Sequence, residues 1–191
     1  MGTLSDVTLA ELQLEVSACT RCGLAAGRTQ TVFGVGSPEA DLMFVGEAPG
    51  RDEDLQGEPF VGRSGKLLDQ LMAEELGMDR RSCFIGNVLR CRPPGNRDPR
   101  PEEVESCRPF LERQIELIDP KVIVTLGNFA TQVVLDRTEG ISRLRGRHYP
   151  YRTGAVVVPT YHPSYALRGG GMVVAEMRAD LVRAKLALAS A

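Results

Sequence analysis

Several features are absent or scarce in this sequence of 191 residues. It contains no apolar run near the roughly eighteen residues that suggest a membrane-spanning helix, so no association with a membrane is expected. Residues 1–10 lack the charged start and apolar stretch of a secretory signal, which predicts an intracellular, cytoplasmic protein. No internal repeat, low-complexity tract or linker divides the chain. We therefore expect a single domain over residues 1–191.

A strong excess of charge is also missing. The formal net charge is −2, which argues against a protein that coats nucleic acid non-specifically. Lysine is rare, yet 20 of the 23 basic residues are arginine, and five of these lie in residues 141–171, which contain no acidic residue. A second group surrounds Cys91 (Arg80, Arg81, Arg90, Arg92, Arg97 and Arg100). Arginine suits phosphate contacts, but an arginine-rich codon usage would give the same composition, and the two interpretations have equal weight.

Apolar runs that end in glycine or proline predict strands at residues 41–45, 82–89, 121–126 and 155–159. Helical spacing of apolar residues predicts helices at 9–18, 64–76, 101–118, 128–135 and 172–188. This alternation predicts an α/β fold, a three-layer sandwich with a central, mostly parallel four-stranded sheet. Ligands of such sheets bind where the strands end, so the loops 46–50, 127–128, 161–168 and the residues from Asn87 onward are the expected site.

Four cysteines form two separated pairs, Cys19 with Cys22 and Cys91 with Cys107. In a reducing compartment such thiols are typical of metal ligands rather than disulfides. Zinc and an iron–sulfur cluster both accept four thiolates, and the spacing does not separate them. Cys83 lies within a predicted strand and is interpreted as a small buried hydrophobe. The less favoured alternative is that all five cysteines belong to the core.

Individual polar and aromatic residues at the strand ends each admit two interpretations. Glu47 can orient a ligand or a water, or it can cap a helix or pair with an arginine. Phe60, in a loop bounded by glycine and proline, can stack on a flat ligand or join the core. The Asn87 amide can donate and accept at once to a planar ligand, or satisfy a neighbouring loop. His162 is one of only two histidines, and its place after a strand favours function over structure.

Taken together, the motifs resemble the family 4 uracil-DNA glycosylases, the iron–sulfur branch of the uracil-DNA glycosylase superfamily. The resemblance runs from Cys19 nearly to the end of the chain. Its carriers are Cys19-x-x-Cys22, Gly46-Glu47-Ala48-Pro49-Gly50, Gly57-Glu58-Pro59-Phe60-Val61-Gly62, Asn87, Cys91-Arg92-Pro93-Pro94, Cys107 and His162-Pro163-Ser164. It implies a monofunctional DNA glycosylase that flips uracil out of DNA, hydrolyses its N-glycosidic bond and so initiates base excision repair.

The resemblance also implies a role for particular residues. A [4Fe-4S] cluster would bind Cys19, Cys22, Cys91 and Cys107, in a site formed by residues 19–22 and 91–107. Glu47 and His162 would be catalytic. Uracil would be contacted by Glu47, Ala48, Pro49, Phe60, Val61, Asn87 and His162. The segment 164–171 would be a loop that enters the minor groove, with DNA contacts through Tyr165, Leu167 and Arg168. The expected partner is uracil-containing DNA, single- or double-stranded, and the expected state is a monomer.

Two positions depart from other branches of the superfamily. Ala48 stands where those branches place the aspartate that positions water, and Gly50 stands where the best-known branch has an aromatic that excludes thymine. A metal-stapled nucleic-acid binding module without catalysis is kept as an alternative function. A hydrolase that acts on a free nucleoside is a third, less favoured because of the arginine-rich faces.

Overall fold

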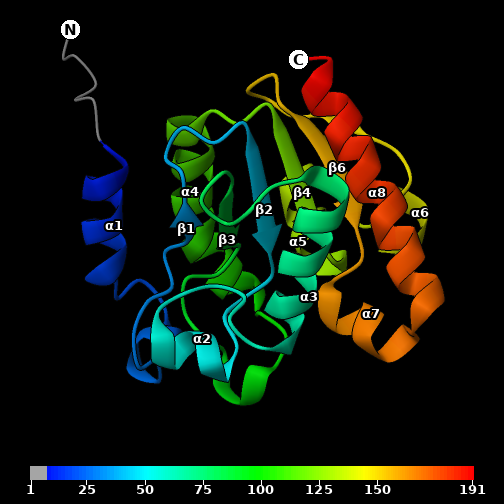
Figure 1. Cartoon of the computed structure of the whole chain (residues 1–191). Helices are drawn as coiled ribbons and strands as arrows, with labels where there is room; N and C mark the ends of the chain where they lie inside the picture. Colours follow the sequence, from blue (N-terminus) through cyan, green and yellow to red (C-terminus); the bar gives the residue numbers. More distant parts are fainter. Residues whose placement is uncertain (1–7) are drawn as a thin grey trace, which may run out of the picture.

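The fold is built around one mixed sheet, seen in a computed structural model that describes residues 8–191 (Figure 1). Its strand order is β1-β3-β2-β4-β6-β5. The four central strands run parallel: β2 (Leu42–Gly46), β3 (Phe84–Asn87), β4 (Val122–Leu126) and β6 (Val156–Thr160). These are the four strands predicted from the sequence, so the α/β class and the mostly parallel sheet are confirmed.

The sheet has six strands, not the four predicted, because two short edge strands were not foreseen. β1 (Val35–Gly36) and β5 (Tyr149–Pro150) are two residues long each, and both pair antiparallel. A strand of that length has no periodicity of its own. It exists because a neighbouring, longer strand supplies the hydrogen-bonding edge.

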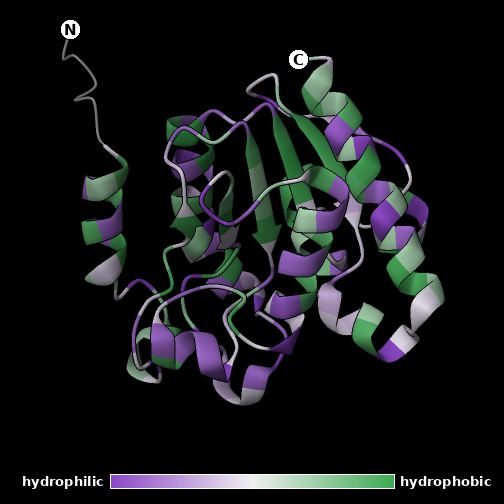
Figure 2. Cartoon of the chain, in the orientation of Figure 1, coloured by the Kyte–Doolittle hydropathy of each residue, from purple (hydrophilic) through white to green (hydrophobic). Residues whose placement is uncertain are grey.

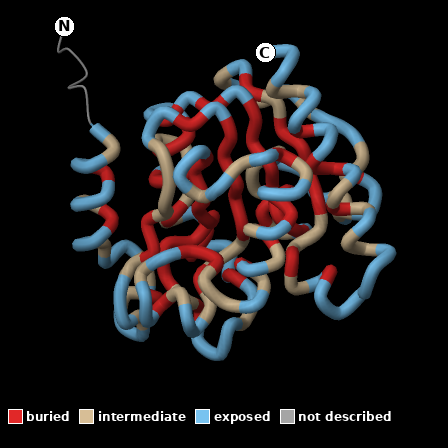
Figure 3. Tube along the Cα trace, viewed as in Figure 1, coloured by how far each residue is buried: buried red, intermediate tan, exposed pale blue. Residues whose placement is uncertain are grey.

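Side chains of the central strands alternate between two cores, as the period of two requires. Met43 and Val45 of β2 face the core that also contains residues of α1 (Leu9–Ser17) and α4 (Pro101–Ile118). Leu42 and Phe44 face the other core, with residues of α3 (Arg63–Leu71) and α8 (Gly171–Ala189). The central strands are therefore mostly apolar and, apart from Val156, buried, whereas the covering helices are polar outside (Figures 2 and 3).

The helices differ from the predicted ones in their details. The helix expected at residues 64–76 is α3 followed by a π-helical turn, η2 (Met72–Leu76), and α5 (Asn128–Leu135) is as predicted. Two short helices were not predicted, α2 (Arg51–Gln56) and α6 (Ile141–Leu144). Two 3-10 turns, η1 (Gly23–Ala26) and η3 (Pro94–Asn96), complete the elements.

The segment 164–171, predicted to be a loop, is mostly helical instead. Helix α7 spans Pro163–Gly169, and α8 follows directly. Pro163 occupies the first helical position, where its missing N–H is no loss, and the His162 side chain caps the helix by accepting the Ser164 N–H.

None of the helices in residues 8–191 is both long enough and apolar enough to span a bilayer. The expectation about a secretory signal concerns residues 1–10, most of which lie outside the described part of the chain.

Candidate active site

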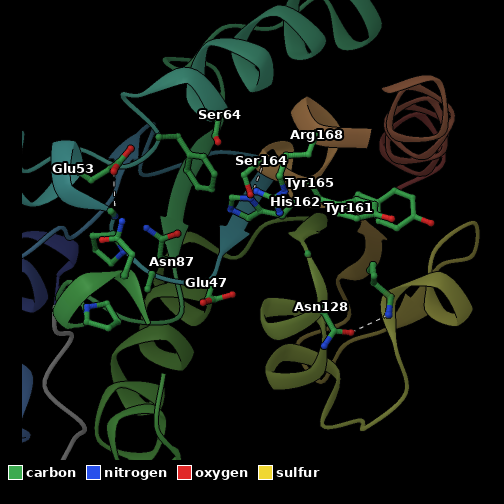
Figure 4. A pocket seen from close by; sticks show the side chains of 18 of the residues that line it. Glu47, Glu53, Ser64, Asn87, Asn128, Tyr161, His162, Ser164, Tyr165 and Arg168 are labelled. Atoms are coloured by element: carbon green, nitrogen blue, oxygen red, sulfur yellow. Dashed lines mark hydrogen bonds between the residues drawn. The ribbon is translucent and has the colours of Figure 1, made fainter. Parts of the chain in front are cut away.

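A cavity of about 640 Å³ opens at the edge of the sheet where the parallel strands end. The loops that follow β2, β3, β4 and β6 all contribute to it (Figure 4). Eight of the predicted site residues line this cavity: Glu47, Ala48, Pro49, Phe60, Asn87, His162, Tyr165 and Arg168. The fold thus brings together residues that are up to 121 positions apart, from Glu47 to Arg168.

Two rings and one amide lie close together in this cavity. The centroids of the Phe60 and His162 rings are 5.7 Å apart, with the planes inclined by 33°. Gly46, the last residue of β2, lies beneath them. A Cβ on Gly46 would come within 2.5 Å of both Asn87 Oδ1 and Phe60 Cζ, so only glycine lets the three approach one another.

Asn87 presents an amide oxygen that has no hydrogen-bond partner among residues 8–191. It is the last residue of β3, pairs in register with Gly46 of β2, and is only 2% exposed. Its Oδ1 is buried and accepts no hydrogen bond from the described residues. Leaving such an acceptor unsatisfied costs about 1–3 kcal/mol. A ligand that donates a hydrogen bond at this point would recover that free energy.

His162 is held as a neutral ring with a defined tautomer. Its Nδ1 accepts hydrogen bonds from the Ser164 backbone N–H, at 3.1 Å, and from the Ser164 hydroxyl, at 2.8 Å. Nδ1 therefore carries no proton, and the ring proton is on Nε2. Burial and, to a smaller extent, the positive charge of Arg168 together lower the pKa of His162 to about 4. At neutral pH the ring is an uncharged hydrogen-bond donor.

Glu47 adds a carboxyl group to the same space (Figure 4). Burial raises the pKa of Glu47, and repulsion from the carboxylate of Asp98 raises it as well. A carboxylate with a raised pKa accepts a proton more readily than an exposed one does. The cavity thus offers a proton acceptor, a neutral donor, an aromatic face and a free amide.

Comparison with known proteins identifies the family. Residues 33–184 match the family model described as the uracil DNA glycosylase superfamily. The chain belongs to this superfamily. The type-4 uracil-DNA glycosylase of Archaeoglobus fulgidus is 48% identical over 84% of this chain and 83% of its own length. That of Sulfurisphaera tokodaii is 46% identical over 84% and 76%, and that of Thermotoga maritima 47% over 80% and 80%.

The predicted resemblance to the iron–sulfur branch of the uracil-DNA glycosylase superfamily is thereby confirmed. Two of the residues carried over from that resemblance do not line the cavity. Val61 directs its backbone N–H to Glu53 Oε1, at 3.1 Å. Leu167 lies on α7 with 41% of its surface exposed. Their proposed contacts with uracil and DNA remain predictions.

Glu53 and Ser64 line the cavity although they lie outside the loops that were expected to form the site. Asn128, Tyr161 and Ser164 lie within those loops but were given no individual role. Glu53 accepts hydrogen bonds from the backbone of Gly50, at 3.1 Å, and of Gly62, at 3.4 Å, so it ties two loops together. A signal for it existed. Glu53 lies three residues after Gly50, the spacing of the acidic member of a capping box at a helix start.

The four paired cysteines converge beside α1 and α4. Cys91 and Cys107 are buried in the core on that side of the sheet, and Cys19 and Cys22 pack against it. Burial raises the pKa of Cys91 and raises that of Cys107 to about 11, and proximity to Cys22 contributes to both shifts. Arg28 Nη1 donates to Cys91 Sγ at 3.3 Å. Cys83 instead packs against Met72, in the opposite core.

Proposed function

We propose that this protein excises uracil from DNA by hydrolysing the bond between the base and the deoxyribose, the first step of base excision repair. The observation that carries the proposal is the buried, unpartnered Asn87 oxygen, which lies in one cavity with the Phe60 ring and the neutral His162. The relatives are uracil-DNA glycosylases by name and give no support to a binding module without catalysis.

Recognition follows from the hydrogen-bonding groups of the base. A flipped uracil presents an N3–H donor beside the O4 acceptor, and it would stack on Phe60. Asn87 Oδ1 would accept from N3–H while its Nδ2 donates to O4. Cytosine offers an acceptor at N3 and a donor at C4, the reverse order. A fixed Asn87 would leave both pairs unsatisfied, which is the basis for rejecting cytosine.

Catalysis would depend on stabilising the departing base. As the glycosidic bond breaks, its electron pair leaves with uracil N1 and negative charge develops on O2. His162 Nε2–H would donate to O2, and one such donor stabilises a transition state by about 3–4 kcal/mol. A water then bonds to C1′ of the sugar, and its released proton passes to Glu47 or to solvent. The products are an abasic site and the uracil anion, which then takes up a proton from solvent.

We also propose that Cys19, Cys22, Cys91 and Cys107 hold a [4Fe-4S] cluster. A single zinc ion also accepts four thiolates, and the resemblance to the iron–sulfur branch of the superfamily favours the cluster. The all-sulfur donor set and the Arg28 hydrogen bond to Cys91 fit such a cluster, which would tie distant segments together.

DNA would bind across the cavity mouth, beside α7. Tyr165 packs on Tyr161 with ring centroids 5.1 Å apart, and Arg168 lines the cavity. Leu167, exposed on the same helix, would fill the space that a flipped nucleotide leaves in a duplex. We propose that a monomer acts on uracil in single- or double-stranded DNA.

A direct test uses the purified protein and a labelled oligonucleotide with one uracil, followed by alkali to cleave abasic sites. Strand cleavage at the uracil, and none in matched oligonucleotides with cytosine or thymine, is the expected result. An intact uracil strand together with measurable DNA binding would instead establish the binding module. Cleavage of free deoxyuridine at a similar rate would favour the nucleoside hydrolase.

A further inference from the structure

Phe60 has a backbone conformation that an aromatic residue rarely adopts. Its φ angle is +55°, in the left-handed region, although it is not glycine. Such a residue stores strain and persists only when its surroundings fix it. The Phe60 ring is 6% exposed and lies at the cavity. What holds the backbone therefore determines where the ring lies.

Arg80 binds this backbone from the carbonyl side. Its guanidinium donates to the Pro59 oxygen at 2.8 Å and also to the Phe60 oxygen. Its Nε donates to Asp69 Oδ1 on α3 at 2.7 Å, which fixes the direction of the fork. The Arg80 side chain is 23% exposed, whereas that of Arg81 is 93% exposed. A planar guanidinium that donates to one carboxylate and to two successive backbone carbonyl groups can fix the orientation of both peptide groups.

The opposite side of the same loop is held as well. Glu53 accepts hydrogen bonds from the N–H groups of Val61 and Gly62, the two residues after Phe60. In the first turn of α3, a Cβ on Gly65 would overlap the Phe60 carbonyl, so the helix lies directly against it. The peptide groups around Phe60 are thus held by a cation on one side and a carboxylate on the other.

We propose that Arg80 is a positioning residue for base recognition, which holds Phe60 in its left-handed conformation so that the ring is in place before the base arrives. Arg80 does not line the cavity and acts only through Phe60. Preorganisation of this kind removes the ordering of the loop from the binding step. The inference rests on the proposed excision of uracil.

A purely structural role for Arg80 makes a different prediction. If Arg80 only linked α3 to the loop, its loss would lower stability and slow excision whether or not position 60 carried a ring. If it acts through Phe60, the effects of removing Arg80 and of removing the ring cannot multiply. A double-mutant cycle measures this difference.

The experiment compares wild type, Arg80→Ala, Phe60→Ala and the double variant in single-turnover excision of uracil at saturating enzyme. We expect Arg80→Ala to slow excision by about tenfold to a hundredfold. We expect it to change the rate of the Phe60→Ala variant by less than about twofold. A wild-type rate in Arg80→Ala, or an equal loss in both backgrounds, would overturn the proposal.

Arg81→Ala is the matched control, because this neighbouring arginine is exposed and pairs only with Asp79 among the described residues; its rate should equal that of wild type. Thermal melting establishes that each variant is folded at the assay temperature. If Arg80→Ala does not fold, Asp69→Asn replaces it in the cycle, since it keeps Arg80 but weakens its anchor. An unchanged rate in Asp69→Asn would then overturn the inference. Failure of wild type to excise uracil overturns the proposed function itself.

Discussion

In the proposed function, base selectivity depends on the orientation of one buried amide, that of Asn87. Asn87→Asp keeps the size of the side chain and one acceptor but removes the NH₂ donor to O4. We expect uracil excision to fall by about 100-fold or more, with a relative gain for cytosine, in oligonucleotide cleavage assays. Asn96→Asp is the matched control, because Asn96 lines the same cavity while its oxygen accepts from Arg92 at 2.7 Å. Unchanged cleavage of uracil alone by Asn87→Asp would contradict the assigned role.

The protonation state of His162 determines the lowest pH at which its ring is neutral and can act as the proposed hydrogen-bond donor. With a pKa of about 4 in the fold against 6.5 for a free side chain, the folded protein binds fewer protons than the unfolded chain between these values. The stability associated with the neutral ring is therefore complete above about pH 6.5 and decreases as the pH falls toward 4.

We expect the His162 ring signals in NMR spectra to show a neutral, Nε2-protonated ring from pH 8 down to about pH 5. His148, the second histidine, provides a separate signal in the same spectra. His162→Gln should lower the single-turnover rate by about 100-fold. A His162 ring that titrates near pH 6.5 would show that burial does not control it.

At the scale of elements, the parallel strands were predictable because each is an apolar run bounded by glycine, proline or asparagine. The site followed from them, since the ends of parallel strands meet at one edge. Helix α7 was missed because the segment 164–171 was expected to be a loop, whereas Pro163 starts a helix. The contact between Arg80 and Phe60 was not predictable, because nothing local to either residue specifies a partner 20 positions away.

Under the proposed cluster assignment, the cluster links the segments 19–22 and 91–107, which lie outside the sheet. Cys91→Ala should give a colourless protein and lower the free energy of unfolding by about 4 kcal/mol or more, the range seen when a metal site is lost. Ultraviolet–visible absorbance and denaturant unfolding measure the two effects. The matched control is Cys83→Ala, which should keep a broad brown absorbance and cost about 1 kcal/mol. A brown, stable Cys91→Ala would exclude this residue as a ligand.

At the scale of the whole molecule, the arginines fall into those that form contacts within the protein and those that are available to a ligand. Many arginines form ion pairs within the protein. These are Arg145 with Glu176 and Asp180, Arg152 with Glu112 and Glu116, and Arg97 with Glu103. Arg90 is fully buried. Arg168, by contrast, forms no ion pair with the described residues and lies at the cavity. The two groups seen in the sequence are therefore not one continuous phosphate-binding surface.

Arg168→Ala should weaken DNA binding and reduce the slope of log K against log salt by about one, because one phosphate contact is lost. Arg183→Ala is the control. Arg183 borders a second cavity, beside Lys121 and Val156, where β4 and β6 begin. Fluorescence anisotropy with a labelled oligonucleotide at several salt concentrations compares them. Equal slopes for wild type and Arg168→Ala would remove Arg168 from the interface.

Asn87 and Cys91 lie on one stretch of five residues that leaves β3 and reaches the sulfur site. Under the proposed cluster assignment, this peptide makes the placement of Asn87, and with it the recognition of uracil, dependent on the supply of iron. Stepwise chelation should abolish excision before the sheet melts, since Cys91 takes no part in the backbone pairing of β2, β4 and β6. An iron-starved cell would then retain a folded protein that no longer excises uracil.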